Sequence, residues 1–464
     1  MPDLWGDQPP AAVAGLCPSQ QAGDAGSQRW GFAEPAVWTP RMLRTLERGI
    51  EGGRWFRLFD KVFAERTLRS AFIDVRCNDG SAGVDGHSVR AFEAHELNEV
   101  AMLSAELKAG TYRPLSLRRV YIPKPGSEEK RPLSIPAVRD RVVQGALKAV
   151  IEPIFENEFA EQSYGFRPGR GCKDALRRVE ELLKDGYTHV VDADLKSFFD
   201  TIPHEKLMAR VREHLADGRV LDLIESFLKA GILDGLKEWT PESGTPQGGV
   251  VSPLLANLYL NALDHEMARA GWQMVRYADE LPALLREEFG RLSRCARLVI
   301  LCRSAEEAQA ALEQVQRWVN AEGLTLHPQK TRIVDVRERG GFDFLGYHFE
   351  RGMRWPRSKS MQKLRERIRE LTPRLCGHSL GRAIERLNQT LRGWYGYFRH
   401  SKSTAFTTVD KFVRGRLRSM LRRRAKRRGK ARGADHQRYK NAYFDAAGLF
   451  NLMKAWTADR QSHS

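Results

Sequence analysis

Residues 189–204 read HVVDADLKSFFDTIPH, and this stretch decides how the rest of the chain is interpreted. Its first five residues form a short, largely β-branched run that predicts a strand, and Pro203 begins a helix. Asp194 therefore follows a strand directly. Asp279 is predicted to end a second strand, which occupies residues 273–277. Carboxylates at two strand ends far apart in the sequence are what a two-cation phosphoryl-transfer site requires, because hard cations prefer oxygen ligands.

Strands and helices alternate around this stretch without a regular repeat, which favours an α+β fold over a doubly wound parallel sheet. Residues 122–131, IPKPGSEEKR, contain a Pro-Gly pair that predicts a strand-turn-strand hairpin. Further strands are expected at 298–302 and 342–349, and helices at 139–159, 254–263, 305–320, 362–371 and 380–398.

Composition divides the chain into three parts. Residues 1–34 are rich in Ala, Gly, Pro and Gln without a sustained period, which predicts a flexible leader. Near residue 355 the chain becomes helical and basic, so we expect a catalytic unit at 35–355 and an all-helical unit at 356–464. Within Lys411–Arg432 twelve residues are Lys or Arg and none is acidic. Like charges at this density cannot all find protein partners, so we expect them to face solvent or phosphate.

The whole chain is also basic, with 76 Lys and Arg against 58 Asp and Glu and a formal net charge of +18. This surplus fits a protein that holds a polyanion, and nucleic acid is the leading candidate. The six cysteines lie far apart without a CxxC or Cys/His cluster, which indicates neither a zinc module nor a disulfide framework and favours a reducing compartment. No apolar run approaches 18 residues. We therefore expect a cytoplasmic protein with no membrane span.

A series of motifs in fixed order, from about Trp55 to Leu452, resembles the bacterial group II intron reverse transcriptase-maturases. The motifs are AGVDG (82–86), GTYRPLSLRRVYIPKPGSEEKRPLSIP (110–136), SYGFRPGRG (163–171), DADLKSFFDTIPH (192–204), GTPQGGVVSPLLANLYL (244–260), VRYAD (275–279), LTLHPQKT (324–331) and FDFLGYHF (342–349). The resemblance implies a right-hand polymerase with fingers and palm, followed by an all-helical thumb and maturase extension. No endonuclease module with Cys and His residues follows, so none is expected.

The resemblance also implies an activity and its partners. The chain would be an RNA-directed DNA polymerase, a nucleotidyltransferase that extends a DNA primer with dNTPs along an RNA template and uses two Mg²⁺ ions. Its maturase region would bind structured intron RNA and assist splicing.

Roles for individual residues follow from the same resemblance. Asp194, the backbone oxygen of Leu195 and Asp279 would hold the metal ions. The residues implied for nucleotide binding are Phe199 under the incoming sugar, Gln247 in the loop under the templating base, Lys124 and Arg131 at the triphosphate, and Lys330 at the departing pyrophosphate. The residues implied for RNA binding are Arg422, Arg423, Arg424, Lys426, Arg427 and Arg428.

Two further features allow two interpretations each. Gly248 and Gly249 permit close approach of nucleic acid or form an ordinary turn at the start of a helix, and both can be true at once. The aromatic rings between Trp394 and Phe398 either stack on RNA bases or pack between helices.

The chain departs from the family pattern at the second carboxylate. The family reads Tyr-Ala-Asp-Asp, then an aromatic residue and a short apolar strand. Here Asp279 is followed by Glu280, and the apolar strand resumes only at Val299, so nineteen residues occupy a gap where the family has two. The insertion is predicted to lie at the tip of the hairpin that presents the metal ligands.

Three interpretations of this departure compete. Glu280 replaces the second carboxylate; or the inserted segment folds aside and weak activity persists; or the polymerase is inactive and only an RNA-binding splicing maturase remains. We favour retained but impaired catalysis. Whether the polymerase serves intron mobility or has been adopted for repair or phage defence is left open by the sequence.

Overall fold

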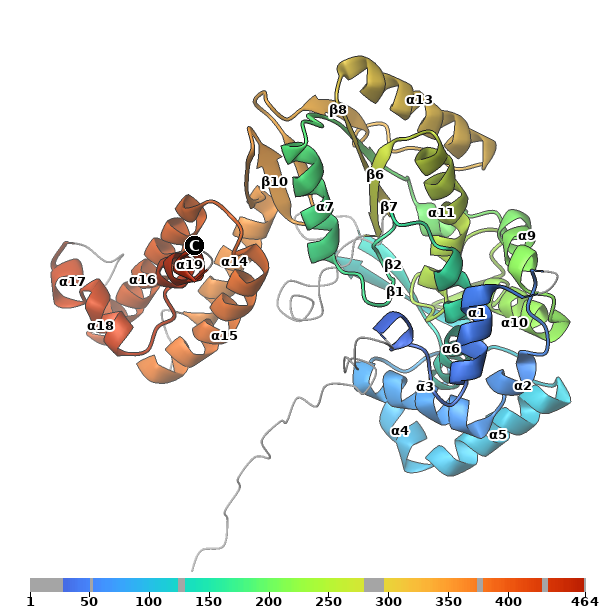
Figure 1. Cartoon of the computed structure of the whole chain (residues 1–464). Coiled ribbons are helices and arrows are strands. Elements are labelled where there is room, and N and C mark those ends of the chain that lie inside the picture. The colour runs from blue at the N-terminus through green and yellow to red at the C-terminus, as the bar shows by residue number, and fades with distance from the viewer. Residues whose placement is uncertain are drawn as a thin grey trace, which may run out of the picture. The chain divides into compact units, whose positions relative to one another are not determined.

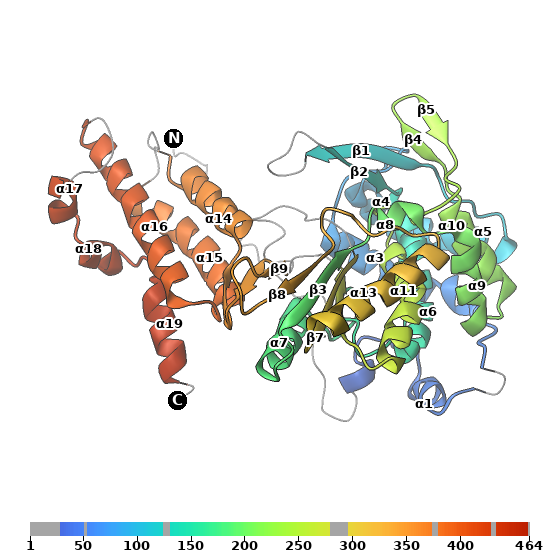
Figure 2. The ribbon, with the colours of Figure 1, turned by 90° about the horizontal axis from the view of Figure 1, so that it is seen from above.

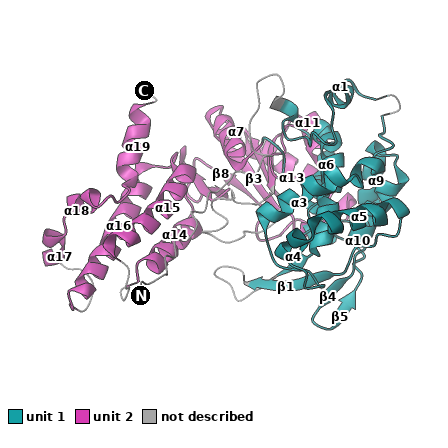
Figure 3. Cartoon of the chain, turned by 90° about the horizontal axis from the view of Figure 1, so that it is seen from below, with its two compact units in different colours: residues 1–160, 166–169, 199–262 teal, residues 161–165, 170–198, 263–464 magenta. Residues whose placement is uncertain are grey.

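The computed structural model describes residues 28–50, 53–123, 130–278, 296–373, 379–427 and 433–462, which form two compact units (Figures 1 and 3). Unit 1 comprises residues 1–160, 166–169 and 199–262, and unit 2 comprises residues 161–165, 170–198 and 263–464. Each unit combines helices with a largely antiparallel sheet. The predicted α+β fold class is confirmed.

Unit 1 is a set of helices beside one four-stranded sheet. The sheet order is β2-β1-β4-β5, with strands β1 (Leu117–Pro123), β2 (Lys130–Ile135), β4 (Ile232–Asp234) and β5 (Lys237–Trp239). The helices are α1 (Pro40–Arg48), α2 (Phe59–Val62), α3 (Glu65–Asn78), α4 (Val89–Ala94), α5 (Glu96–Ala109), α6 (Val138–Glu158), α9 (His204–His214) and α10 (Gly218–Leu228). Strands β1 and β2 pair antiparallel, so the predicted hairpin strands are confirmed, and the turn between them lies outside the described residues.

Unit 2 contains the sheet built on residues 189–194. The sheet order is β6-β7-β3-β8, all antiparallel, with strands β3 (His189–Asp194), β6 (Gln273–Ala278), β7 (Ala296–Cys302) and β8 (Arg332–Asp335). One face buries Val190, Val299 and Leu301 in a cluster with residues of α7 (Cys172–Lys184). Helix α13 (Ala305–Ala321) also packs against the sheet (Figure 2). Two helices, α8 (Phe198–Thr201) and α11 (Ser252–Arg269), cross from one unit to the other along the chain.

The prediction of one strand at 342–349 is wrong, because this stretch is a hairpin. Strands β9 (Phe342–Phe344) and β10 (Tyr347–Glu350) pair antiparallel, and β11 (Met353–Pro356) extends the same sheet. Leu345 and Gly346 form the two-residue turn, with φ of 46° and 82°. A two-residue hairpin turn with both φ positive suits Gly but is rarely taken by Leu, so Gly346 alone carries the usual turn signal.

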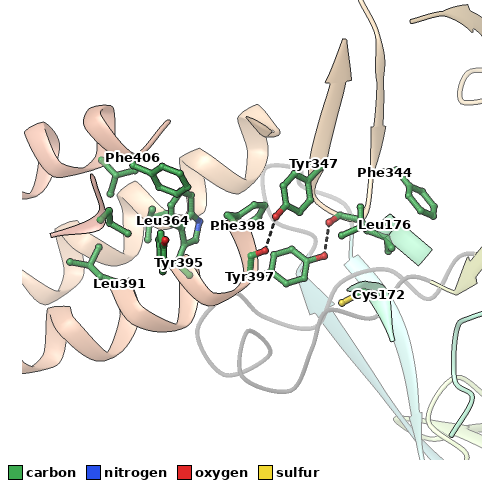
Figure 4. Close-up of a cluster of buried hydrophobic side chains, with 14 of the residues drawn as sticks. Cys172, Leu176, Phe344, Tyr347, Leu364, Leu391, Tyr395, Tyr397, Phe398 and Phe406 are labelled. Atoms are coloured by element: carbon green, nitrogen blue, oxygen red, sulfur yellow. Dashed lines mark hydrogen bonds between the residues drawn. The ribbon is translucent and has the colours of Figure 1, made fainter. Parts of the chain in front are cut away.

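The remaining helices of unit 2 share one hydrophobic core with its sheets. These helices are α14 (Ser358–Leu371), α15 (Leu380–Phe398), α16 (Ser403–Arg424), α17 (Gly433–Arg438), α18 (Asn441–Ala446) and α19 (Leu452–Gln461). Trp394, Tyr397 and Phe398 of α15 are buried in this core, and the hydroxyl of Tyr347 donates a hydrogen bond to the Tyr397 carbonyl at 2.6 Å (Figure 4). The aromatic residues of α15 therefore pack between helices, which is the second of the two interpretations.

Two smaller expectations need adjustment. Trp30, within the predicted leader, is buried in unit 1, and its indole nitrogen donates a hydrogen bond to Glu47 at 2.7 Å. Residues 1–27 lie outside the described residues. Cys172 and Cys302 are buried free thiols, but Cys77 is disulfide-bonded, so the expectation of reduced cysteines is wrong for Cys77.

Candidate active site

The ends of β3 and β6 lie at the same end of one sheet. Asp194, the last residue of β3, is the partner of Arg297 on β7, and Arg297 is also the partner of Tyr277 on β6. The two strand ends thus flank β7, about 10 Å apart, because neighbouring strands lie about 4.8 Å apart. Asp279 and Glu280 follow β6 and lie outside the described residues, so their positions stay predictions.

The two carboxylate oxygens of Asp194 have different surroundings. The residue is 6% exposed, and its Oδ2 accepts a hydrogen bond from Nζ of Lys330 at 2.7 Å. Its Oδ1 is buried and has no hydrogen-bond partner among the described residues. A buried carboxylate oxygen without a donor costs free energy unless a cation reaches it. Asp194 therefore fits the role of a metal ligand.

Lys330 reaches Asp194 because its segment pairs with the residues that follow β3. Leu195 and Leu326 form an antiparallel bridge, and the backbone N–H of His327 donates to the carbonyl of Asp194 at 2.7 Å. Leu195, whose backbone oxygen the sequence assigns to a metal ion, is buried at this bridge. The structure thus brings together three of the predicted site residues, Asp194, Leu195 and Lys330.

The insertion leaves the strands on either side of it paired. The ladder between β6 and β7 runs without a bulge from Gln273 and Leu301 to Ala278 and Ala296. The residues that the structure does not describe, 279–295, therefore connect the two ends of an intact hairpin.

A buried ion pair joins β6 to α11. Arg276 and Asp264 are 1% and 0% exposed, and Nε of Arg276 lies 2.9 Å from one Asp264 oxygen while Nη2 lies 2.6 Å from the other. Nη2 also donates to Oγ of Ser163 at 2.7 Å. Sequence reasoning missed this set, although an Arg within the apolar strand before Asp279 was a usable signal, because a buried Arg requires an acidic partner.

Only part of a metal site is visible. Within the described ranges, no group of three or more His, Cys, Asp or Glu residues could hold a metal ion. The further ligands implied by the sequence, Asp279 and Glu280, fall in the gap at 279–295.

The predicted sugar and template residues line a cavity in unit 1. Its volume is about 530 Å³, and its walls include Phe199, Asp200, Gln247, Arg119 and Trp239. Phe199 is 1% exposed. The loop that contains Thr245 and Gln247 is held to Phe199 by a hydrogen bond from the backbone N–H of Thr245 to the Phe199 carbonyl at 2.6 Å. Phe199 and Gln247 therefore share one pocket, which is consistent with two contacts to one ligand.

Asp200 is one of two acidic residues that line this cavity, and the other is Glu242. Burial raises its pKa, and the nearby Arg119 and a hydrogen bond from Gln247 act in the opposite direction. Nε2 of Gln247 donates that bond to Oδ2 of Asp200 at 2.9 Å. The Gln247 amide is thus held in one orientation at the cavity wall.

The glycines beside Gln247 approach the protein's own backbone. Gly248 has φ of 137°, and a Cβ there would overlap the carbonyl oxygen of Ser134 on β2. The backbone N–H of Ser134 in turn donates to the Gln247 carbonyl at 2.8 Å. Packing of this loop against β2 explains Gly248 without nucleic acid.

The predicted triphosphate residues belong to the β1–β2 hairpin. Arg131 pairs through its backbone with Ile122, and its side chain lies outside what the structure describes, as does all of Lys124. Both assignments stay predictions.

The basic block divides into paired and exposed residues. Arg422 donates to Asp435 at 2.7 Å, and Arg418 donates to the Tyr439 carbonyl at 2.9 Å. Four other predicted RNA-binding residues are exposed: Arg423, Arg424, Lys426 and Arg427. The remaining one, Arg428, lies outside the described residues. The expectation that the block faces solvent or phosphate is therefore wrong for Arg418 and Arg422, because Asp435 and backbone oxygens supply partners that the block itself lacks.

The comparisons with known proteins decide the family. Residues 122–294 match the reverse transcriptase (RNA-dependent DNA polymerase) family, and residues 361–439 match the group II intron maturase-specific domain. Protein YkfC of Escherichia coli (strain K12) is 36% identical over 360 residues, which cover 69% of this chain and 86% of YkfC. The chain belongs to the group II intron reverse transcriptase-maturase family. Group II intron-encoded protein LtrA of Lactococcus lactis subsp. cremoris is 33% identical to this reverse transcriptase-maturase over 267 residues, 57% of the chain and 44% of LtrA.

Solved structures of low identity also resemble the reverse transcriptase-maturase. The match to a chain of a partial Cas6-RT-Cas1--Cas2 complex covers 57% of this chain and 43% of that chain, at 23% identity and with a TM-score of 0.35. The match to apo telomerase from Candida tropicalis covers 71% of this chain and 59% of the telomerase chain, at 9% identity and with a TM-score of 0.43. The assignment rests on the sequence matches. Among the described helices, none is long and apolar enough to cross a membrane.

Proposed function

We propose that this reverse transcriptase-maturase copies RNA into DNA at the sheet end that carries Asp194. The observation that supports this most is the Asp194 carboxylate, with Lys330 on one oxygen and no donor among the described residues on the other. Two Mg²⁺ ions are the proposed cofactors, held by Asp194, the Leu195 carbonyl and Asp279. When bound, the ions would supply the positive charge that stabilises the in-line transfer of a nucleotide to a primer 3′-hydroxyl.

The chain's own residues divide the remaining work. Lys330, already directed at the site, would neutralise or protonate the departing pyrophosphate. Phe199 would exclude a 2′-hydroxyl under the incoming sugar, so that dNTPs are preferred, and Gln247 would lie under the templating base. Lys124 and Arg131 would hold the triphosphate, a task that suits a point charge and a forked guanidinium.

The RNA partner is proposed to contact the exposed end of α16. Arg423 and Arg424 end α16, Lys426 and Arg427 lie just beyond it, and Arg428 follows in the sequence. Phosphate contacts by these residues would give salt-dependent binding of template or intron RNA. We place the protein in the cytoplasm, with a DNA primer and dNTPs as its other partners.

We further propose that polymerase activity persists in spite of the insertion, at a reduced level. The continuous β6–β7 ladder supports this, because both strands approach the insertion in the register that a short turn would need. Glu280 is the candidate for the second carboxylate. The competing proposal, a splicing factor that has lost catalysis, predicts RNA binding without primer extension.

The decisive experiment is Mg²⁺-dependent dNTP incorporation on poly(rA)/oligo(dT), with salt-dependent RNA binding measured on the same preparation. The wild type is compared with a variant that lacks residues 281–297 and carries Glu280→Asp. We expect measurable extension by the wild type and faster extension by the variant. RNA binding without extension by either protein would contradict the polymerase proposal and favour the splicing factor.

A further inference from the structure

Arg297 occupies an unusual position on the hairpin. In the family pattern, the second carboxylate and an aromatic residue directly precede the apolar strand. Here the two residues before Val299 are Arg297 and Leu298. By strand register, a cation therefore stands where the family pattern has an acid, with Asp194 and Tyr277 as its partners on the two neighbouring strands.

The guanidinium of Arg297 is held by an acid of β3. Its Nε lies 2.9 Å from Oδ1 of Asp192, and its Nη2 lies 2.8 Å from Oδ2. The side chains are 17% and 3% exposed. Asp192 lies two residues before Asp194, so the two acidic side chains share one face of the strand. On the other side of β3, Arg332 of β8 approaches the same carboxylate at 3.9 Å.

This ion pair matters because the connection between β6 and β7 is long. A two-residue turn would itself set the register of a hairpin. A connection of seventeen residues, 279–295, imposes no such register. Val299 and Leu301 are buried apolar residues whose packing has little directional geometry, whereas a two-bond Arg-carboxylate pair has strict geometry.

We propose that Arg297 is a positioning residue that keeps the interrupted hairpin in register. The pair with Asp192 holds β7 to β3, and the backbone ladder holds β6 to β7, so together they keep the end of β6 level with Asp194. The catalytic part of this inference rests on the proposed polymerase function. The structural part concerns only the strands of unit 2.

The test uses the full chain with Arg297→Gln, Arg297→Lys and Asp192→Asn. Arg337→Gln is the matched control, because Arg337 also makes a two-bond pair, with Asp335 at the opposite end of β8. Two kinds of measurement are made. The first is amide hydrogen exchange over residues 296–300, and the second is steady-state kinetics, which gives kcat, the dNTP KM and the Mg²⁺ requirement.

We expect Arg297→Gln and Asp192→Asn to raise exchange over 296–300 at least tenfold while the control leaves it unchanged. They should lower kcat at least tenfold, leave the dNTP KM within twofold and raise the half-saturating Mg²⁺ concentration. Arg297→Lys should recover part of the loss, because it restores the charge but not the fork. The double variant Asp192→Asn/Arg297→Gln should show the same exchange rate and the same kcat as either single variant, because both changes remove the same interaction.

The two readouts separate two kinds of failure. Unchanged exchange in Arg297→Gln, or an equal increase in the control, would overturn the positioning role. A kcat loss that the control shares would do the same, since it would reflect general destabilisation. If the wild type extends no primer, the proposed function fails, and hydrogen exchange alone still decides whether Arg297 holds the register.

Discussion

Two buried aspartates, Asp140 in unit 1 and Asp194 in unit 2, have different partners. In unit 1, Asp140 accepts hydrogen bonds from the Tyr112 hydroxyl at 2.6 Å and the Leu115 N–H at 3.0 Å, and burial raises its pKa to about 6. Burial also raises the pKa of Asp200. In unit 2, Asp194 faces the ammonium group of Lys330.

This difference teaches that the partner, more than the residue type, decides what an aspartate can do. Burial makes Asp140 costly to ionise, although the hydrogen bonds from the Tyr112 hydroxyl and the Leu115 N–H lower its pKa, so this acid serves packing and loop geometry. An acid beside a cation, with one oxygen still free of donors, remains a ligand for a second cation. We therefore expect the polymerase to depend on the acids of the sheet in unit 2, and unit 1 to depend on its acids for stability.

The largest expected effect concerns Asp194. Asp194→Ala should lower primer extension by at least about a thousandfold, because it removes the carboxylate that would hold the metal ions. The measurement is steady-state dNTP incorporation in Mg²⁺. The control is Asp335→Ala at the far end of the same sheet, which should change the rate less than twofold. Unchanged incorporation by Asp194→Ala would remove the basis of the site assignment.

A smaller effect is expected for the cation that faces Asp194. Lys330→Gln should lower kcat by about a hundredfold, the usual contribution of a positioned proton donor. If catalysis needs only the positive charge, Lys330→Arg should lower kcat less than Lys330→Gln does. If catalysis needs proton donation, both variants should lower kcat equally. Measuring pyrophosphate release in both variants separates these roles. Wild-type kcat in Lys330→Gln would show that the ion pair with Asp194 is structural.

The smallest effect tests the acids of unit 1. The pKa of Asp140 in the folded protein, about 6, is above the ordinary 3.8. Its contribution to stability is therefore full below pH 4 and is lost as the pH rises through 6. Asp140→Asn carries no such charge, so its free energy of unfolding relative to the wild type should rise by about 2 kcal/mol between pH 4 and 7.

Urea unfolding at several pH values measures this difference. The comparison variant is Asp335→Asn, because Arg337 lowers the pKa of Asp335 to about 2. Its pH-dependent contribution has the opposite sign: it is present above pH 4 and is lost as the pH falls towards 2. A difference for Asp140→Asn that stays constant from pH 4 to 7 would contradict a neutral Asp140 in the folded state.

The fold around the site was predictable because its signals are local. The run at 189–193 is β-branched and bounded by polar residues, and it forms β3 as expected. Lys330 was expected at the departing pyrophosphate, but only through the motifs that carry the family resemblance, and its ion pair with Asp194 was not predicted. Spacing alone would have left Lys330 as one exposed lysine among many.

The features that sequence reasoning missed depend on contacts between distant residues. Arg422 was expected to face solvent because its own basic block holds no acid, yet its partner Asp435 lies just beyond that block. Arg276 and Asp264 meet only because α11 packs beside β6. The turn at Leu345 was missed because Leu rarely takes a positive φ, and tertiary packing overrides that preference.

The shared core of unit 2 has a consequence for how this protein could evolve. Residues on both sides of position 355, from Phe342 and Tyr347 to Leu391 and Trp394, are buried in one cluster. The helices that match the maturase-specific domain therefore share their hydrophobic core with the sheet that carries Asp194. Mutational drift could erase nucleotide transfer at the hairpin and leave splicing assistance intact, but one polar substitution in the common interior would cost the cell both activities together.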